Sequence, residues 1–249
     1  MQPFLSIIIP SFNESENISK GVLDEVSKYL SGQKYGWEII LVDDGSTDGT
    51  LEDLQNIIKG KKNWRLVKSP HQGKAQTVKV GVMEAAGDLV LFTDFDQATP
   101  LSEVEKLLPF LQKGYDVAIG SREVKGSERL KEPWYRHLMG KVFNRVVQMF
   151  AISGISDTQC GFKLFTNHTA KDLFNSLVVY ADGTEVTAFT GAFDVELLYI
   201  AQKRGYRIAE VPVSWKYVST VRVNPIRDSV RMFLDVLRIR ITDLSGGYQ

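Results

Sequence analysis

The stretch Leu89-Val90-Leu91-Phe92-Thr93-Asp94-Phe95-Asp96-Gln97-Ala98-Thr99-Pro100 is an apolar run that ends in two carboxylates one residue apart. The apolar part is typical of a buried strand, and Thr99-Pro100 predicts the start of a helix. In a strand, the side chains of Asp94 and Asp96 would point the same way. Because two close carboxylates repel each other, they favour a bound cation, and Mg²⁺ or Mn²⁺ suits hard oxygen ligands. The sequence predicts a metal site here, with an ordinary turn as the alternative.

Apolar runs and amphipathic segments alternate on both sides of this stretch. Strands are expected at residues 5–10, 37–42, 64–67, 89–93 and 116–119, then in 156–165 after a loop and once or twice in 207–218. Helices are expected at residues 16–30, 50–58, 75–86, 101–111, 134–150, 193–203 and 225–241, and residues 123–133 are expected to form a charged loop. This order predicts an α/β fold with a mostly parallel, Rossmann-like sheet and helices on both faces.

Polar residues follow the first, second and fourth expected strands. In parallel sheets of this kind, ligands bind beyond the carboxyl ends of the strands. One crevice should therefore collect Asn13, Glu14, Asp43, Asp44, Asp94 and Asp96. Carboxylates gathered at one edge destabilise each other unless a ligand or a metal uses them, so the pattern favours a binding site.

Composition narrows the class of protein. The chain has 249 residues, with 30 Lys and Arg against 30 Asp and Glu, so its formal net charge is zero. That balance gives no overall basic field for nucleic acid, and the length fits one large domain or a domain with an appendage. The single Cys160 rules out an internal disulfide, indicates a reducing compartment and is expected to be a packed thiol. No signal-peptide pattern or 18-residue apolar window is found, so a cytoplasmic location without a transmembrane helix is expected.

Further motifs follow the strands in a fixed order. They are Pro10-Ser11-Phe12-Asn13-Glu14, Asp43-Asp44-Gly45-Ser46, Gly73-Lys74, Asp94-Phe95-Asp96, Gly120-Ser121-Arg122, Asp157-Thr158-Gln159-Cys160-Gly161-Phe162-Lys163 and Phe193-Asp194-Val195-Glu196. With these motifs, residues 5–218 resemble the family-2 glycosyltransferases of the GT-A fold, in particular the polyprenyl- and dolichyl-phosphate glucosyl- and mannosyltransferases. The last two motifs look most like the dolichyl-phosphate β-glucosyltransferase branch. The resemblance implies a GT-A domain at 1–218, followed by an amphipathic helix and tail at 219–249.

The resemblance also implies roles for the matching positions. The nucleotide sugar would contact Pro10, Phe12, Glu14, Asp43, Asp44, Lys74, Asp94 and Arg136, and Asp94 and Asp96 would hold Mg²⁺ or Mn²⁺. Three residues are expected to be catalytic: Arg122 by holding phosphate, Asp157 by orienting the acceptor or the sugar, and Asp194 as the second candidate for that role. The alternatives are a loop cap for Asp157 and a helix-dipole contact for Asp194. The chain departs from the family at Ala75 and Phe95, where small glycine-like residues are more common, and in an insertion at 180–191.

The expected function is a metal-dependent, inverting transfer of a hexose from a nucleotide sugar to a polyprenyl or dolichyl phosphate, with glucose from UDP-glucose favoured. The alternatives are transfer from GDP-mannose to the same acceptor, or transfer to a sugar hydroxyl in polysaccharide or cell-wall synthesis. A degenerate member that only binds nucleotide is a third possibility. A nicotinamide-dependent enzyme is disfavoured, because no Gly-x-Gly-x-x-Gly follows the first strand.

The final expected helix, at 225–241, has an apolar stripe from which its arginines stand largely apart. The stripe comprises Ile226, Val230, Phe233, Leu234, Leu237 and Ile241, and the arginines are Arg227, Arg231, Arg238 and Arg240. Two interpretations fit this pattern: a helix packed on the domain, or a basic amphipathic helix that lies on an anionic bilayer. The second predicts a peripheral protein at the cytoplasmic face of a membrane.

Overall fold

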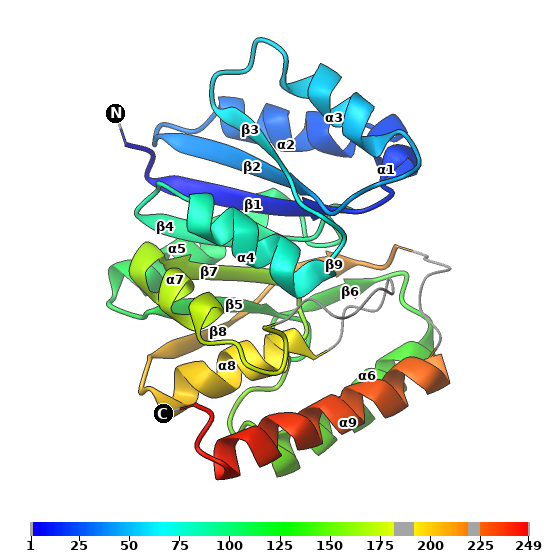
Figure 1. Cartoon of the computed structure of the whole chain (residues 1–249), viewed down its shortest axis with the longest axis vertical. Coiled ribbons are helices and arrows are strands. Elements are labelled where there is room, and N and C mark those ends of the chain that lie inside the picture. The colour runs from blue at the N-terminus through cyan, green and yellow to red at the C-terminus, as the bar shows by residue number, and fades with distance from the viewer. Residues whose placement is uncertain (1, 182–191, 219–224, 249) are drawn as a thin grey trace.

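A seven-stranded sheet forms the centre of the computed structural model, which describes residues 2–181, 192–218 and 225–248 (Figure 1). Its strands, in chain order, are β1 (Leu5–Ser11), β2 (Trp37–Asp43), β3 (Trp64–Lys68), β4 (Leu89–Thr93), β5 (Val117–Ser121), β7 (Phe162–Thr166) and β8 (Ile208–Pro212). In space the order is β3-β2-β1-β4-β7-β5-β8, and β7 alone runs antiparallel to its neighbours. The expected mostly parallel sheet is confirmed.

Helices cover both faces of this sheet. One face carries α1 (Ser15–Ser19), α2 (Val22–Ser31), α3 (Thr50–Ile58) and α5 (Val104–Gln112). The other carries α4 (Lys74–Glu84), α7 (Asn167–Asn175) and α8 (Phe193–Lys203), with α6 (Trp134–Phe150) and α9 (Pro225–Leu244) packed side by side beyond α8 (Figure 1). A small parallel pair, β6 (Glu128–Leu130) and β9 (Ser214–Lys216), lies beside the main sheet.

Strand β1 shows why the central strands are apolar on both sides. Ile7 and Ile9 pack into the cluster beneath α2 and α5, while Ile8 packs into the cluster beneath α4. All three side chains are fully buried. A strand covered on both faces needs a continuous apolar run rather than alternation, which is the pattern in its sequence.

Two local expectations were wrong. The helix expected at 16–30 is divided into α1 and α2, because Gly21 adopts a left-handed conformation with φ +78°. Residues 123–133 contain β6 rather than only a loop. Strand β4 ends at Thr93 as expected, and Asp94 and Asp96 lie in the turn after it, where the alternation of a strand does not set the direction of their side chains.

The start of the helix after this turn also differs from the expectation. Pro100 has an extended backbone with ψ 142°, so Thr99 does not cap a helix that begins at Pro100. A short 3₁₀ turn, η1 (Leu101–Glu103), follows and leads into α5. The turn that carries the acidic pair is thus held away from the helix by several residues.

Candidate active site

The loops after β1 and β2 are joined by hydrogen bonds at the carboxyl edge of the sheet. The amide of Thr47 donates to Asn13 Oδ1 at 2.8 Å, and the amide of Asn13 donates to Ser46 Oγ at 3.0 Å. Asn13 has φ +55°, a left-handed conformation that asparagine tolerates better than most residues. The two loops therefore form one wall of the crevice expected at this edge.

Asp43, at the end of β2, presents a buried acceptor to this wall. Its side chain is 2% exposed, and Oδ2 accepts from the amide of Ser46 at 3.1 Å. Its other oxygen, Oδ1, is buried without a hydrogen-bond partner among the described residues. Because a buried polar atom is costly when unpaired, Asp43 Oδ1 is suited to a ligand that brings an N–H group.

Asp44 fastens the loop that leads into α4. Its Oδ1 accepts from the amide of Gln72 at 2.9 Å, and its Oδ2 accepts from the amide of Gly73 at 3.1 Å. Oδ2 also lies 2.8 Å from His71 Nδ1. The His71 ring stacks on Phe12 with 4.1 Å between centroids and 11° between planes. Asp44 thus holds an aromatic pair in place beside the crevice.

The acidic pair lies at the opposite wall, beyond β4. Asp96 Oδ1 accepts from the amide of Ala98 at 3.0 Å, and Lys74 Nζ lies 2.5 Å from Asp94 Oδ1. Burial, together with the carboxylates of Asp94 and Glu14, raises the pKa of Asp96 to about 6. Asp94 and Asp96 follow β4 and Glu14 follows β1, so the loops after two neighbouring strands both contribute negative charge to this part of the site.

Two carboxylates can serve as part of a divalent-metal site. Among the described residues, no group of three or more His, Cys, Asp or Glu side chains is arranged to hold a metal. Mg²⁺ is commonly held by one or two carboxylates, with its other oxygens supplied by substrate phosphates and water. Asp94 and Asp96 fit that arrangement, which requires a phosphate-bearing ligand to complete it.

Gly161 permits the position of Asp94. A Cβ atom at residue 161 would overlap with the Asp94 carboxylate. The amide of Asp94 donates to the carbonyl of Gly161 at 3.2 Å, so the two backbones are also in direct contact. The glycine between Cys160 and Phe162 therefore makes room for the Asp94 carboxylate.

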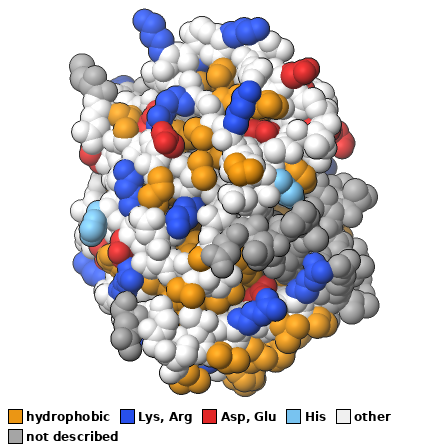
Figure 2. Space-filling model, viewed as in Figure 1, with side chains coloured by type: hydrophobic (Ala, Val, Ile, Leu, Met, Phe, Trp, Pro, Cys, Tyr) orange, Lys and Arg blue, Asp and Glu red, His pale blue; other side chains and the backbone are white. Residues whose placement is uncertain are grey.

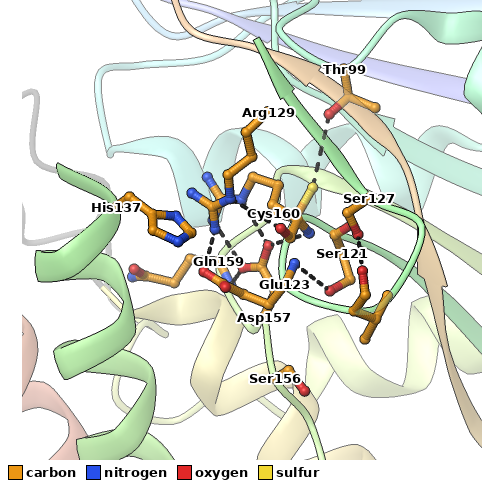
Figure 3. Close-up of polar contacts among 12 residues, drawn as sticks. Thr99, Ser121, Glu123, Ser127, Arg129, His137, Ser156, Asp157, Gln159 and Cys160 are labelled. Carbon is orange, nitrogen blue, oxygen red and sulfur yellow. Dashed lines mark hydrogen bonds and ion pairs between the residues drawn. The ribbon is translucent and has the colours of Figure 1, made fainter. Parts of the chain in front are cut away.

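A second, cationic part of the site lies after β5. Arg122 Nε donates to Asp157 Oδ2 at 2.7 Å and Arg122 Nη2 to Oδ1 at 2.9 Å, so the pair is bidentate. Asp157, shown in Figure 3, is fully buried, whereas the Arg122 side chain is 20% exposed. Although burial opposes ionisation, Arg122 lowers the pKa of Asp157 to about 2. Both Asp157 oxygens are thus occupied, and the Arg122 guanidinium is the group of the pair that is accessible from outside.

Sequence reasoning missed two residues that support this pair. Arg129 forms ion pairs with Glu123 and with Glu132, the latter at 2.6 Å, and its Nε donates to the carbonyl of Arg122 at 3.0 Å. Figure 3 shows Arg129 beside Asp157 and Glu123. Arg129 therefore holds the backbone at Arg122, a role that no motif in the sequence indicates.

Glu210 is the second missed residue. Its carboxylate accepts from the amides of Ser156 at 2.9 Å and Asp157 at 2.8 Å, and from Ser121 Oγ at 2.7 Å. It lies on β8, next to β5 in the sheet, and so ties the Asp157 loop to β5, the strand that directly precedes Arg122.

Asp194 is paired with a buried lysine that was also missed. Lys163 Nζ lies 2.5 Å from Asp194 Oδ1 and donates to the carbonyl of Cys160 at 2.6 Å. The Lys163 side chain is fully buried on β7 and lies over the Phe92 ring. A charged residue within the apolar run Phe-Lys-Leu-Phe was the signal that could have identified it.

The remaining predicted positions are placed as follows. Pro10 is buried within β1, and Glu14 is 9% exposed at the end of the first loop. Cys160 is 1% exposed, which confirms the expectation of a packed thiol, and burial raises its pKa to about 11. Arg136 lies in α6, with its side chain outside the described part of the structure, and most of the insertion at 180–191 is also outside it.

Comparison with known proteins identifies the family. The sequence profile of "Glycosyl transferase family 2" matches residues 6–174. Proteins named dolichyl-phosphate beta-glucosyltransferase are similar over nearly the whole chain: that of Dictyostelium discoideum is 35% identical over 98% of this chain and 76% of its own length. Those of Saccharomyces cerevisiae and Homo sapiens are 36% and 33% identical, over 99% and 98% of this chain and 77% of their own lengths.

Solved structures support the fold. Mannosyl-3-phosphoglycerate synthase from Rubrobacter xylanophilus superposes with a TM-score of 0.66 at 20% identity, over 99% of this chain and 76% of its own. A mannosyltransferase from Pyrobaculum calidifontis, solved with GDP-Man and Mn²⁺, gives a TM-score of 0.62 at 19% identity, over 96% of this chain and 65% of its own. The profile match over more than half of the chain and the identities above 30% lead to one conclusion: this chain belongs to glycosyl transferase family 2.

Proposed function

We propose that this protein transfers glucose from UDP-glucose to a polyprenyl or dolichyl phosphate, with inversion at the anomeric carbon and with Mg²⁺ or Mn²⁺ bound. The observation that carries the proposal is the similarity, at 33–36% identity over nearly the whole chain, to proteins named dolichyl-phosphate beta-glucosyltransferase. The geometry supports it, because a metal-competent acidic pair and a fixed arginine lie at the same edge of the sheet. A metal held by the acidic pair would supply positive charge to the donor diphosphate, and the arginine would supply it to the acceptor phosphate.

The nucleoside would bind against the wall formed by the loops after β1 and β2. Asp43 Oδ1 is the buried acceptor without a partner, and the N3–H group of uracil is a donor of the kind that it lacks. The stacked Phe12 and His71 rings provide an aromatic surface beside it. This pairing favours UDP-glucose, although the N1–H group of guanine could also donate to Asp43, so GDP-mannose is the competing donor.

The diphosphate would lie between the acidic pair and the cationic residues. Asp94 and Asp96 would hold the divalent metal, which neutralises charge on the departing nucleoside diphosphate. Lys74 lies at the start of α4, beside Asp94, and adds a positive charge on the same side. These residues stabilise a leaving group that would otherwise carry its negative charge unpaired.

The acceptor would be recognised by Arg122. Its guanidinium is oriented by Asp157 and by a cation–π contact with Trp215, so it presents a fixed donor to a phosphate oxygen. A phosphate monoester has a second pKa near 6 and is already anionic at neutral pH. Its oxygen bonds to the anomeric carbon as the bond to the nucleoside diphosphate breaks on the opposite face. No proton has to be removed, so this mechanism needs no strong general base.

A transfer assay tests the proposal. Purified protein with Mn²⁺, radiolabelled UDP-glucose and dolichyl phosphate in detergent should form a glucolipid that partitions into organic solvent. GDP-mannose should give much less product, and free sugars should not replace the lipid phosphate as acceptor. Label transferred to a sugar hydroxyl and not to the lipid would overturn the acceptor assignment, whereas equal or greater transfer from GDP-mannose would overturn the donor.

We also propose that the protein contacts an anionic bilayer through one apolar surface of α6 and α9, called here the α6–α9 face. Its exposed side chains are Val142, Met149, Phe150, Val230, Phe233, Leu234, Ile241 and Leu244. Figure 2 shows apolar side chains gathered where Figure 1 places α9, with Lys and Arg side chains above them. Arg238 and Arg240 of α9 are 65% and 47% exposed. Apolar residues flanked by arginines suit the surface of an anionic membrane.

The orientation of α9 supports the membrane interpretation of its sequence. Its buried side carries Val236 and Ile239, which are fully covered, whereas Ile241, from the apolar stripe, is 64% exposed. The stripe is thus largely free of the domain rather than packed on it. Ile226 and Arg227 have side chains outside the described residues. Within the described chain, no helix combines the length and apolar character needed to cross a bilayer.

Polar substitutions on the α6–α9 face should weaken membrane binding. The double variant Leu234→Ser/Ile241→Ser should float with anionic vesicles at least roughly fivefold less than the wild type, because two buried apolar contacts with lipid are lost. The matched control is Leu130→Ser/Val178→Ser, which alters two exposed apolar residues outside α6 and α9. Equal flotation of the two double variants would contradict the assignment of this face.

A further inference from the structure

We infer that Lys74 acts as an internal cation that occupies the acidic pair before the donor binds, and so keeps free divalent metal out until a nucleotide arrives with it. The inference rests on the proposed donor site and adds an order of events to it. Metal and nucleotide would enter together, and Lys74 would then turn from Asp94 to the diphosphate.

The contact between Lys74 and Asp94 is the first observation. Nζ lies 2.5 Å from Asp94 Oδ1, the distance of a direct ion pair. The side chains are 20% and 38% exposed, so the pair lies at the mouth of the site rather than in the core. An ammonium group on this oxygen repels a second cation there, since like charges a few ångströms apart are strongly unfavourable away from bulk water.

Among the described residues, Lys74 is the cation in direct contact with the acidic pair, through Asp94 Oδ1. Removal of this one charge would leave Asp94 and Asp96 with no described cation in direct contact. Such a pair of carboxylates attracts a divalent cation more strongly than the pair with its lysine does.

Asp194 offers Lys74 a second carboxylate. It directly follows Phe193 in α8, and Lys163 holds it, with Nζ 2.5 Å from Asp194 Oδ1. Lys74 Nζ also lies 5.9 Å from the centroid of the Phe193 ring, next to Asp194. When a metal takes Asp94, the long side chain of Lys74 can leave that oxygen without losing all of its negative partners.

A metal titration separates this role from simple donor binding. Free Mn²⁺ is measured by electron paramagnetic resonance in the wild type and in Lys74→Met, Lys74→Arg and Lys79→Met, with and without UDP. Without UDP, Lys74→Met should bind Mn²⁺ roughly tenfold more tightly than the wild type. Lys74→Arg keeps the charge and Lys79→Met alters another lysine of α4, so both should match the wild type. UDP should tighten Mn²⁺ binding more in the wild type than in Lys74→Met.

The outcomes are distinguishable. If Lys74→Met binds Mn²⁺ no more tightly than the wild type without UDP, the inference is wrong even when UDP and Mn²⁺ bind normally together. If the wild type binds no Mn²⁺ with UDP present, the proposed donor site itself fails. Circular dichroism melts confirm that each variant is folded, and Lys74→Gln replaces Lys74→Met in the same comparison should the latter not fold.

Discussion

We expect Asp96→Asn to abolish the rise in melting temperature that UDP and Mn²⁺ together should give the wild-type protein. A ligand that binds only the folded state stabilises it by mass action, by about 2.7 kcal/mol at a concentration 100 times its Kd. Asparagine removes one of the two carboxylates that would hold the metal, so this stabilisation is lost. The measurement is a thermal-shift panel with UDP, GDP, UDP-glucose and GDP-mannose, each with and without Mn²⁺.

The same variant should be more stable than the wild type when no ligand is present. Burial and Asp94 raise the pKa of Asp96 to about 6 in the folded protein, from an ordinary value of 3.8. The fold therefore disfavours the ionised form of Asp96, which lowers the free energy of unfolding. This loss of stability is complete above about pH 6 and absent below about pH 4. Without ligand, Asp96→Asn should melt above the wild type at pH 7.5, and the gain should vanish toward pH 4.

The control for Asp96 is an exposed carboxylate far from the site. Asp24→Asn, in the first turn of α2, should leave both the ligand-free melting temperature and the UDP–Mn²⁺ shift close to those of the wild type. A metal-dependent shift that persists in Asp96→Asn would exclude Asp96 as a metal ligand.

Asp157→Asn should destabilise the protein and remove most of its transfer activity. The substitution takes the negative charge from a fully buried group and leaves the largely buried Arg122 without its ionic partner. Loss of one member of such a pair typically costs about 3–5 kcal/mol. Urea unfolding at pH 7 should show that loss, and transfer should fall because Arg122 is no longer held toward the acceptor.

The stability that Asp157 contributes should depend on pH. Arg122 lowers the pKa of Asp157 to about 2, below its ordinary value of 3.8, although burial acts in the opposite direction. The carboxylate therefore contributes stability above about pH 4, and that contribution declines as the pH falls toward 2. The difference between wild type and Asp157→Asn should narrow over the same interval, as far as the protein remains folded.

Asp172→Asn is the matched control for Asp157. Asp172 pairs with Arg204 on the surface, where the two side chains are 30% and 29% exposed, and an exposed pair contributes about 1 kcal/mol or less. It should therefore have a small effect on unfolding and none on transfer. Full activity of Asp157→Asn would refute both roles considered for Asp157, in orienting the acceptor and in holding Arg122.

Local sequence patterns were sufficient to predict much of the fold. The buried strands were predictable because runs such as the one around Ile8 are covered on both faces and carry no polar residue at the centre. The sequence also predicted that the carboxyl ends of the first, second and fourth strands share one edge of the sheet, because these strands were expected to be parallel. The break at Gly21 was not predicted, because the apolar periodicity continues across it and a glycine inside a helical pattern is often tolerated.

Several predicted site residues lie in loops at the carboxyl edge of the sheet, but their partners were not foreseen. Lys163 and Glu210 contact residues that are 31 and 53 positions away in the chain, so no local motif reveals them. The sequence also did not predict which side of α9 faces the domain. Val236 and Leu234 are both apolar, and only packing against the domain determines which of them is covered. Tertiary contacts, rather than local propensity, determine these features.

Strand β7 has a consequence for how the chain folds. It lies between β4 and β5 although it follows both in sequence, and it carries Lys163 two residues after Gly161, the glycine that accommodates Asp94. Until residues 162–166 are inserted, the inner edges of β4 and β5 have no strand between them and can pair with other chains. A nascent chain therefore exposes two unpaired strand edges, on β4 and β5, until β7 inserts between them. The β4 side and the β5 side of the sheet are joined only at this late, non-local step.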